Sequence, residues 1–343
     1  MKGYRVAIVG ATGLVGQEFI KVLEQRNFPI DSLNLLASDR STGKKMFVAH
    51  QEIEVKETTA ESFKGMDIVL FSAGIEVSRY FSPIAAQSGA VVIDNSAAFR
   101  MAPAIPLVVP EVNAEDIEWH QGIIANPNCL TIQMVLVLYP LHKVNPIKRI
   151  IVSTYQSVSG AGAAAVEELT TQSGQVLDGQ NTIPHVFPHQ IAFSLLPEID
   201  VFLDNGYTKE EWKMVQETRK IMHDDDITIS ATCVRVPVFV GHSQATHIEF
   251  SHSMSPDEAR RILVQAPGVK VLDDPTVSLY PQPWSVAGTD EVFVGRIRQD
   301  VSHPNGLAMW VVADNMRKGA ALNAVQIAEE MINRGRIHLR GEI

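Results

Sequence analysis

Cysteine is scarce in this sequence. The 343 residues include only Cys129 and Cys233, and neither belongs to a Cys-x-x-Cys motif or to a cluster with histidine. This scarcity argues against a disulfide framework and against a zinc site, and it is typical of proteins in a reducing compartment. We therefore expect a cytoplasmic protein without a metal.

Basic residues are also in the minority. The chain has 29 Lys and Arg against 39 Asp and Glu, which gives a formal net charge of −10. Proteins that bind nucleic acid through its phosphates rely on clustered positive charge. We expect no nucleic-acid partner, and any anion that binds here must meet a local basic cluster.

Long apolar runs are missing as well. No run approaches the roughly 20 residues that a membrane-spanning helix needs. The segment Tyr4 to Val9 has the pattern of a short strand and not of a signal sequence. We find no internal repeat or low-complexity segment. With 45% hydrophobic and 20% charged residues, the chain is expected to be globular, with about two domains, and to have no membrane contact.

A cysteine stands where a turn becomes an apolar helix, in Ala125-Asn126-Pro127-Asn128-Cys129-Leu130-Thr131. Pro127 ends the preceding strand, and the pattern predicts a helix from Thr131 to Leu138 that Pro140 ends. The first turn of a helix has unpaired N–H groups, which favour the thiolate that attacks carbonyl carbon. Cys129 is therefore a candidate nucleophile, although its position alone also fits a small buried residue.

A glycine-rich loop follows the first predicted strand. Arg5 to Val9 leads into Gly10-Ala11-Thr12-Gly13-Leu14-Val15-Gly16, and a helical pattern comes next. Glycines allow a tight turn, and the N–H groups at the helix start can hold a pyrophosphate. The spacing is Gly-x-x-Gly-x-x-Gly and not the usual Gly-x-Gly-x-x-Gly. The loop therefore predicts a nucleotide site.

The second predicted strand, Asn34 to Ala37, ends at Ser38-Asp39-Arg40-Ser41-Thr42. Arg40 and the flanking hydroxyl groups suit the 2′-phosphate of NADP, whereas Asp39 would suit the ribose of NAD. We favour NADP. A solvated polar loop is the alternative, above all for Asp39.

Two further apolar strands, Asp67 to Ser72 and Ala90 to Asp94, are each followed by small or polar residues. Strands that alternate with helices predict a parallel sheet whose ligands bind at the carboxyl ends of the strands. Arg100 lies just beyond such an end, so it is a candidate for binding an anion. The alternative is a surface cation.

The second half begins with a strand from Arg149 to Tyr155, which leads into the small-residue loop Gln156 to Ala163 and then a helix. Such a bare backbone suits close approach to a ligand or close helix packing. Residues 172–200 have little periodicity, so we expect an irregular arm between domains or subunits.

An amphipathic helix is predicted from Thr208 to Met222, with Thr208 as its N-cap and Glu211 as the capping-box partner. Glu210 and Lys213 share one face of this helix, and an exposed ion pair is the default interpretation.

The β-branched run from Ile227 to Val240 contains Arg235, and His242 follows Gly241. Residues seven apart on an unbroken strand point to opposite faces, so these side chains converge only if Pro237 or Gly241 bends the chain. The last strands are Val292 to Arg298 and Leu307 to Ala313. Asp314 to Gly319 then introduces a helix from Ala320 to Ile332.

Over essentially its whole length, the chain resembles the aspartate-β-semialdehyde dehydrogenase family. The matching motifs are Gly10 to Gly16, Asn126 to Cys129, Gln156 with Ser159 to Gly162, Asn205 to Thr208, Arg235 to His242, and Trp310 to Ala321. The resemblance implies an α/β fold, with a Rossmann-like NADP-binding domain (residues 1–127), an α+β catalytic and dimerisation domain with a mixed sheet (128–313), and a C-terminal helix (314–343) that returns to the first domain. It also implies a homodimer.

The family catalyses the reversible NADPH-dependent reductive dephosphorylation of L-4-aspartyl phosphate to L-aspartate-4-semialdehyde, a step toward lysine, methionine and threonine. By resemblance, Cys129 is the thioester-forming nucleophile, His242 the acid/base and Gln156 the residue that orients the substrate. The implied substrate-binding residues are Arg100, Asn128, Glu210, Lys213 and Arg235. Arg235 would bind the carboxylate, and Arg100 and Lys213 the phosphate. The implied NADP contacts are Gly10, Thr12, Gly13, Leu14, Val15, Ser38, Arg40, Ser41, Ser159, Gly160 and Asn315.

A cysteine nucleophile suits the reaction that the resemblance implies. A thiolate converts an electrophilic acyl phosphate into a thioester, whose carbonyl accepts hydride more readily than a carboxylate does. Two residues depart from the family's pattern. Leu130 stands where the family more often has a small hydroxyl residue, and Asp39 lies between the residues expected to bind the 2′-phosphate. Another acyl-phosphate reductase, such as N-acetylglutamyl-phosphate reductase, and a noncatalytic NADP-binding paralogue are the alternatives.

Overall fold

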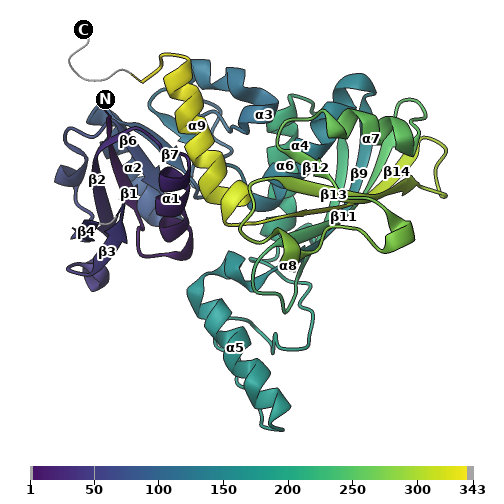
Figure 1. Ribbon diagram of the computed structural model, residues 1–343, viewed down its shortest axis with the longest axis horizontal. Coiled ribbons are helices and arrows are strands. Elements are labelled where there is room, and N and C mark those ends of the chain that lie inside the picture. The colour runs from purple at the N-terminus through teal and green to yellow at the C-terminus, as the bar shows by residue number, and fades with distance from the viewer. Residues whose placement is uncertain (1–2, 50, 338–343) are drawn as a thin grey trace. The chain divides into compact units, whose positions relative to one another are not determined.

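The computed structural model describes residues 3–49 and 51–337 (Figure 1). Contacts within the chain divide it into two compact units. The first unit combines Met1–Asn128 with Ala320–Ile343, and the second is Cys129–Gly319.

The first unit is built on a six-stranded sheet of order β5-β2-β1-β6-β7-β8, in which every pairing is parallel. Its strands are β1 (Tyr4–Val9), β2 (Ile30–Ala37), β5 (Lys56–Glu57), β6 (Ile68–Phe71), β7 (Val91–Asp94) and β8 (Ile123–Ala125). A hairpin of β3 (Lys45–Val48) and β4 (Gln51–Glu54) follows β2. The helices are α1 (Leu14–Gln25), η1 (Asp39–Ser41), η2 (Ala60–Phe63), α2 (Ile75–Gln87), α3 (Pro110–Asn113), η3 (Ala114–Trp119) and α9 (Leu322–Asn333).

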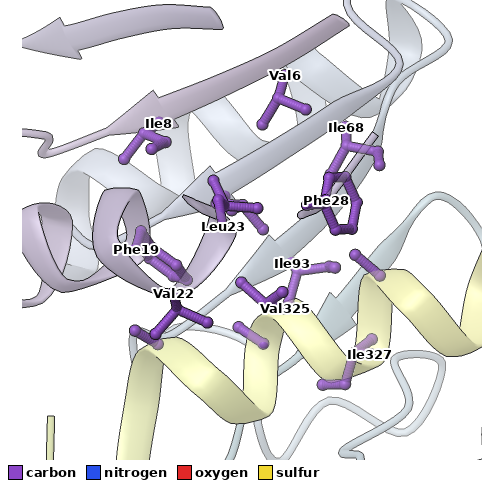
Figure 2. Packing of buried hydrophobic residues seen from close by; sticks show 14 of the residues in the cluster. Val6, Ile8, Phe19, Val22, Leu23, Phe28, Ile68, Ile93, Val325 and Ile327 are labelled. Carbon is purple, nitrogen blue, oxygen red and sulfur yellow. The ribbon is translucent and has the colours of Figure 1, made fainter. Parts of the chain in front are cut away.

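Apolar side chains cover both faces of this sheet, as expected for parallel strands between helices. On one face, Ile8 of β1 packs with Phe19 and Leu23 of α1 and with Val325 of α9 (Figure 2). On the other face, Val69 and its neighbours pack in a second cluster. The last helix of the chain therefore completes the core of the unit that the first helix begins.

The second unit has a mixed six-stranded sheet of order β10-β9-β11-β14-β13-β12. Its strands are β9 (Ile147–Gln156), β10 (Thr228–Arg235), β11 (His242–Phe250), β12 (Val269–Val271), β13 (Val292–Gln299) and β14 (Gly306–Ala313). Strands β9 and β10 are parallel, whereas β11 is antiparallel to both β9 and β14. The helices are α4 (Cys129–Val144), η4 (Val158–Ala161), α5 (Ala163–Leu177), α6 (Lys209–Met222), α7 (Pro256–Val264), η5 (Pro275–Val277) and α8 (Pro283–Val286). The two sheets confirm the predicted α/β class with one parallel and one mixed sheet.

Two predicted boundaries are wrong. Helix α4 continues through Pro140 to Val144. Leu141, just after the proline, is fully buried, so the packing of this apolar helix outweighs the hydrogen bond that proline removes. Helix α5 reaches Leu177, so the irregular arm begins at Asp178 and not at residue 172.

The capping box of α6 is confirmed. The Thr208 Oγ1 accepts the Glu211 N–H at 3.3 Å, and the Glu211 carboxylate accepts the Thr208 N–H at 2.7 Å. Helix α9 is preceded by a π-helical turn, Arg317–Ala321. No helix within residues 3–49 and 51–337 combines the length and the apolar character that crossing a bilayer requires.

Candidate active site

Cys129 is the first residue of α4 and is half-buried. The Gln133 side chain donates to the Cys129 carbonyl at 3.3 Å. Gly319, in the π-helical turn, lies so near that a Cβ there would come within 2.9 Å of the Cys129 Cβ. Only glycine lets this turn pack against the cysteine, and π-helical turns are common at functional sites.

His242 begins β11 and is completely buried. Its Nδ1 accepts the Ser157 backbone N–H at 3.0 Å and also lies 3.0 Å from the Ser157 hydroxyl. A backbone N–H can only donate, so Nδ1 carries no proton and the proton of the neutral ring is on Nε2. The Nε2 atom has no hydrogen-bond partner among the described residues, so it is a buried donor available to a ligand.

The electrostatic surroundings keep this imidazole neutral. Burial, followed by the positive charge of Arg235, lowers the pKa of His242 to about 3. A neutral ring with its proton on Nε2 can donate a hydrogen bond but has no lone pair there to take a proton from a thiol. The bonding therefore favours a donor role over the base role expected from the sequence.

Strand β11 faces the start of α4. Gln244, which shares a strand face with His242, donates to the Leu130 carbonyl at 2.8 Å. The side chains of His242 and Gln244 therefore point toward the helix that begins with Cys129.

Arg235 ends β10 and is also buried. Its Nη1 donates to the Ser157 carbonyl at 2.7 Å, and its guanidinium lies 5.9 Å from the centre of the Phe187 ring. Burial lowers the pKa of Arg235, whereas the negative charges of Glu210 and Cys129 act to raise it. The Cys129 sulfur is thus near enough to influence the guanidinium.

The chain does bend between Arg235 and His242, as their convergence requires. Strand β10 stops at Arg235, and Gly241 has a φ of +92°. A Cβ at Gly160 would lie 3.1 Å from the Arg235 Nη1 and 3.2 Å from the His242 Nε2. The absence of a side chain at Gly160 therefore leaves a space that two buried donors face.

A chain of polar contacts links Gln156 to α6. The Gln156 Nε2 donates to the Glu210 carboxylate at 3.2 Å, and Lys213 contacts both Glu210 and Asp200 at 3.0 Å. Burial favours the neutral form of Lys213, but the two carboxylates prevail and raise its pKa. Glu210 is buried, so the default interpretation of an exposed pair is wrong for this residue.

Asn315 connects the loops around His242. Its Oδ1 accepts the Gly241 N–H at 2.9 Å and the Ser157 hydroxyl at 3.1 Å, and its Nδ2 donates to the Ser159 Oγ at 3.0 Å. Sequence reasoning missed Ser157, which contacts both His242 and Arg235. The only signal was its place between Gln156 and Ser159.

The glycine loop of the first unit has the conformation that a phosphate site needs. Gly10 has a φ of +84°, and a Cβ there would lie 2.1 Å from the Ser72 carbonyl oxygen. Gly13 is the N-cap of α1, which begins with Leu14 and Val15 and has neither a capping side chain nor an acidic residue in its first turn. The first N–H groups of α1 therefore remain suitable for an anion.

The residues after β2 lie beside this loop. The Thr12 hydroxyl donates to the Ser41 hydroxyl at 3.4 Å. Ser38 and Arg40 are exposed, and the Arg40 guanidinium has no hydrogen-bond or ion-pair partner in the described part of the chain. The Asp39 carboxylate accepts the Arg40 N–H at 2.8 Å, so it is used within its own turn.

Arg100 is buried, and backbone carbonyls hold it. Its Nε donates to Asn126 at 2.9 Å and its Nη2 to Asn95 at 2.7 Å. Asn128 is buried as well. Both residues belong to the first unit, whereas the other candidate catalytic and substrate-binding residues belong to the second.

Cys233 is fully buried beside Met214, and burial raises the pKa of its thiol. Such a thiol is unreactive, which leaves Cys129 as the candidate nucleophile. Among the described residues, no group of three or more His, Cys, Asp or Glu side chains could hold a metal ion.

Comparisons with known families give two matches. Residues 5–120 match the family "Semialdehyde dehydrogenase, NAD binding domain", and residues 138–318 match "Semialdehyde dehydrogenase, dimerisation domain".

Individual proteins agree with these families. The chain is 58% identical to aspartate-semialdehyde dehydrogenase of Aquifex aeolicus over 98% of this chain and 100% of that protein. Aspartate semialdehyde dehydrogenase II complexed with ASA from Vibrio cholerae has a TM-score of 0.95 and 47% identity, over 97% of this chain and 99% of that one. Aspartate semialdehyde dehydrogenase with NADP from Candida albicans has a TM-score of 0.76 and 26% identity, over 98% and 100% of the two chains.

Proposed function

Because the chain belongs to the aspartate-semialdehyde dehydrogenase family, we propose that it catalyses the reversible NADPH-dependent reductive dephosphorylation of L-4-aspartyl phosphate to L-aspartate-4-semialdehyde through a thioester on Cys129. One observation supports this mechanism above the others. Two buried donors, the His242 Nε2 and the Arg235 Nη1, face the space over Gly160 in the unit whose first helix begins with Cys129.

The residues of the first unit fit NADP. Gly10 and Gly13 provide the tight turn, Leu14 and Val15 the N–H groups for the pyrophosphate, and Arg40 a guanidinium for the 2′-phosphate. Ser38, Thr12 and Ser41 would add hydroxyl groups, and the family resemblance assigns Ser159, Gly160 and Asn315 to NADP as well. The Candida albicans relative with NADP supports this choice. When bound, the cofactor supplies the hydride.

The protein's own chemistry begins with the thiolate. The Cys129 sulfur attacks the acyl carbon, a carbon–sulfur bond forms, and the bond to the phosphate oxygen breaks, so that phosphate leaves with the electron pair. The acyl group is then a thioester. As its carbonyl is reduced, the negative charge on oxygen needs a donor, which the His242 Nε2–H can provide. Cleavage of the carbon–sulfur bond releases the aldehyde and restores the thiolate.

Different charged residues would bind the two ends of the substrate. Arg235 can bind the amino-acid carboxylate of the substrate with paired hydrogen bonds. Gln156, together with Glu210, can orient the substrate. Lys213 and Arg100, with Asn128, would bind the phosphate.

The two units would divide these tasks. We assign residues 1–127 to NADP binding, 128–313 to catalysis and dimerisation, and 314–343 to the segment that returns to the first domain. Exposed apolar side chains between residues 193 and 202, among them Phe193, Leu195 and Phe202, and the match to a dimerisation domain support a homodimer. The scarcity of cysteine supports a cytoplasmic location.

The reverse assay tests the proposal most directly. The purified protein should reduce NADP when aspartate semialdehyde and phosphate are both present, and omission of phosphate should stop the reaction. A substrate panel with N-acetylglutamate semialdehyde provides the control. Preference for that aldehyde would indicate the other reductase, and no activity in a well-folded preparation would indicate a noncatalytic paralogue.

A further inference from the structure

Two buried side chains of α5 hold the backbone of a neighbouring irregular segment. The Glu168 carboxylate accepts the N–H groups of His185 at 3.0 Å and Val186 at 2.5 Å. One turn later, the Gln172 side-chain oxygen accepts the N–H groups of Ile191 at 3.0 Å and Ala192 at 3.2 Å. Residues 185–192, the anchored segment, are therefore fixed to the helix near both ends.

The two anchors also support each other. The Gln172 Nε2 donates to the second carboxylate oxygen of Glu168 at 3.0 Å. Both side chains are buried, at 7% and 2% exposure for Glu168 and Gln172. A buried carboxylate needs hydrogen-bond donors such as these. Without the carboxylate, the backbone N–H groups of the anchored segment would lose their partner, so the arrangement is costly to disturb.

The anchored segment presents Phe187 to the active site. Phe187 follows Val186 directly, and its ring lies 5.9 Å from the Arg235 guanidinium. The same ring packs against a buried cluster that includes Leu169 and Leu196. The contact of a guanidinium with an aromatic face orients the guanidinium plane as well as attracting its charge.

Arg235 is held both at its backbone and at its guanidinium. Its Nη1 donates to the Ser157 carbonyl, and its backbone pairs with Leu196. The ring of Phe187 is a second contact of the guanidinium, and the segment that carries this ring is bonded to Glu168.

We propose that Glu168 is a positioning residue for the substrate-binding arginine. Through the N–H groups of His185 and Val186 it places Phe187 against Arg235, and so fixes the guanidinium in the direction that receives the substrate's carboxylate. This inference rests on the proposed function, because it takes Arg235 as the carboxylate-binding group. Helix α5 thereby contributes to substrate affinity without contacting the substrate.

The test compares steady-state constants of Glu168→Ala, Phe187→Leu and the wild type in the reverse reaction. Phe187→Leu keeps an apolar side chain and leaves α5 intact, and it should raise KM for aspartate semialdehyde about two- to fivefold. Glu168→Ala should raise it about tenfold. In both variants kcat should stay within about twofold, and KM for phosphate and NADP should not change, because the arginine contributes mainly binding.

Matched variants separate positioning from general damage. Glu167→Ala removes an exposed carboxylate from the same helix and should leave every constant unchanged. Phe187→Tyr keeps the aromatic face and should have the same KM for aspartate semialdehyde as the wild type. The double variant Glu168→Ala/Phe187→Leu should raise KM less than the product of the two single effects, since both act through one contact.

The outcomes distinguish the two proposals. Wild-type turnover of aspartate semialdehyde with an unchanged KM in Glu168→Ala and Phe187→Leu would refute the positioning role alone. Equal rises of all three KM values, or the same loss in Glu167→Ala, would also refute it, because they indicate general damage. A wild type that cannot turn over aspartate semialdehyde would refute the proposed function and this inference with it.

Discussion

Replacing His242 should change how the stability of the protein depends on pH. In the folded protein, burial and the charge of Arg235 lower the pKa of His242 from 6.5 to about 3. In the unfolded chain the imidazole regains its ordinary pKa. Between these two values the unfolded state binds a proton that the folded state does not, so the free energy of unfolding falls as pH falls from 6.5 toward 3. Above pH 6.5 this contribution to stability is fully present.

The magnitude follows from the size of the shift. Each pH unit between the two pKa values changes the free energy of unfolding by about 1.4 kcal/mol. Lowering the pH from 7 to 4.5 should therefore cost the wild type about 2 to 3 kcal/mol through His242 alone. The variant His242→Asn cannot titrate, so it should lack this component of the slope.

Denaturant unfolding at a series of pH values from 4.5 to 8, at one fixed protein concentration, gives the measurement. The difference between the wild-type and His242→Asn curves removes the contribution of the other ten histidines, which both proteins share. His189→Asn removes an exposed histidine and serves as the matched control, with a curve close to that of the wild type.

Parallel curves for the wild type and His242→Asn would refute the reasoning, because they would mean that His242 accepts a proton in the folded protein as easily as in the unfolded chain. The neutral donor assigned to the oxyanion would then be wrong as well. If the donor role is right, His242→Ala, which leaves no side-chain donor at this position, should also lose about a hundred- to thousandfold in kcat.

The sequence predicted the nucleotide-type sheet because its signals are local. A short apolar strand, a glycine loop and a helical pattern lie within residues 4–25, and each depends on neighbours in the chain. The comparisons confirm the family, the α/β class and the dehydrogenase activity that the motifs indicated, and they support the NADP cofactor. The roles of individual site residues and the domain boundaries remain predictions.

Features that depend on distant residues could not be predicted. The tautomer of His242 is set by Ser157, which lies 85 positions earlier in the sequence. The buried Glu210 carboxylate accepts a hydrogen bond from Gln156, which lies 54 positions earlier at the end of β9. In each case the residue type and its local spacing are compatible with an exposed, structural role, and only the fold brings the partner within hydrogen-bonding distance.

Pro140 illustrates the opposite error, since a strong local rule was applied where packing prevails. Proline normally ends or kinks a helix because it lacks an N–H and crowds the preceding turn. In α4, ten residues are buried, and Leu141 lies beyond the proline. The burial of Leu141 outweighs the local penalty, so an apolar residue directly after a proline that follows a hydrophobic run is a reason to extend the predicted helix.

Four substitutions test the remaining assignments. Cys129→Ala should abolish turnover and leave the fold and NADP affinity near normal, whereas Cys233→Ala should be mild; inactivation by iodoacetamide through Cys233 would contradict this pair. Gly10→Ala should destabilise the protein by at least about 1–3 kcal/mol in thermal or denaturant unfolding, because φ is +84° and the added Cβ would collide with the Ser72 carbonyl, whereas unchanged stability would refute the assigned loop geometry. Arg40→Ala should weaken NADP binding about tenfold or more and leave NAD binding almost unchanged, because the guanidinium is the charged group available to a 2′-phosphate. Titration of both cofactors by fluorescence measures the ratio, and an unchanged preference for NADP would transfer the assignment from Arg40 to the lysines that follow it.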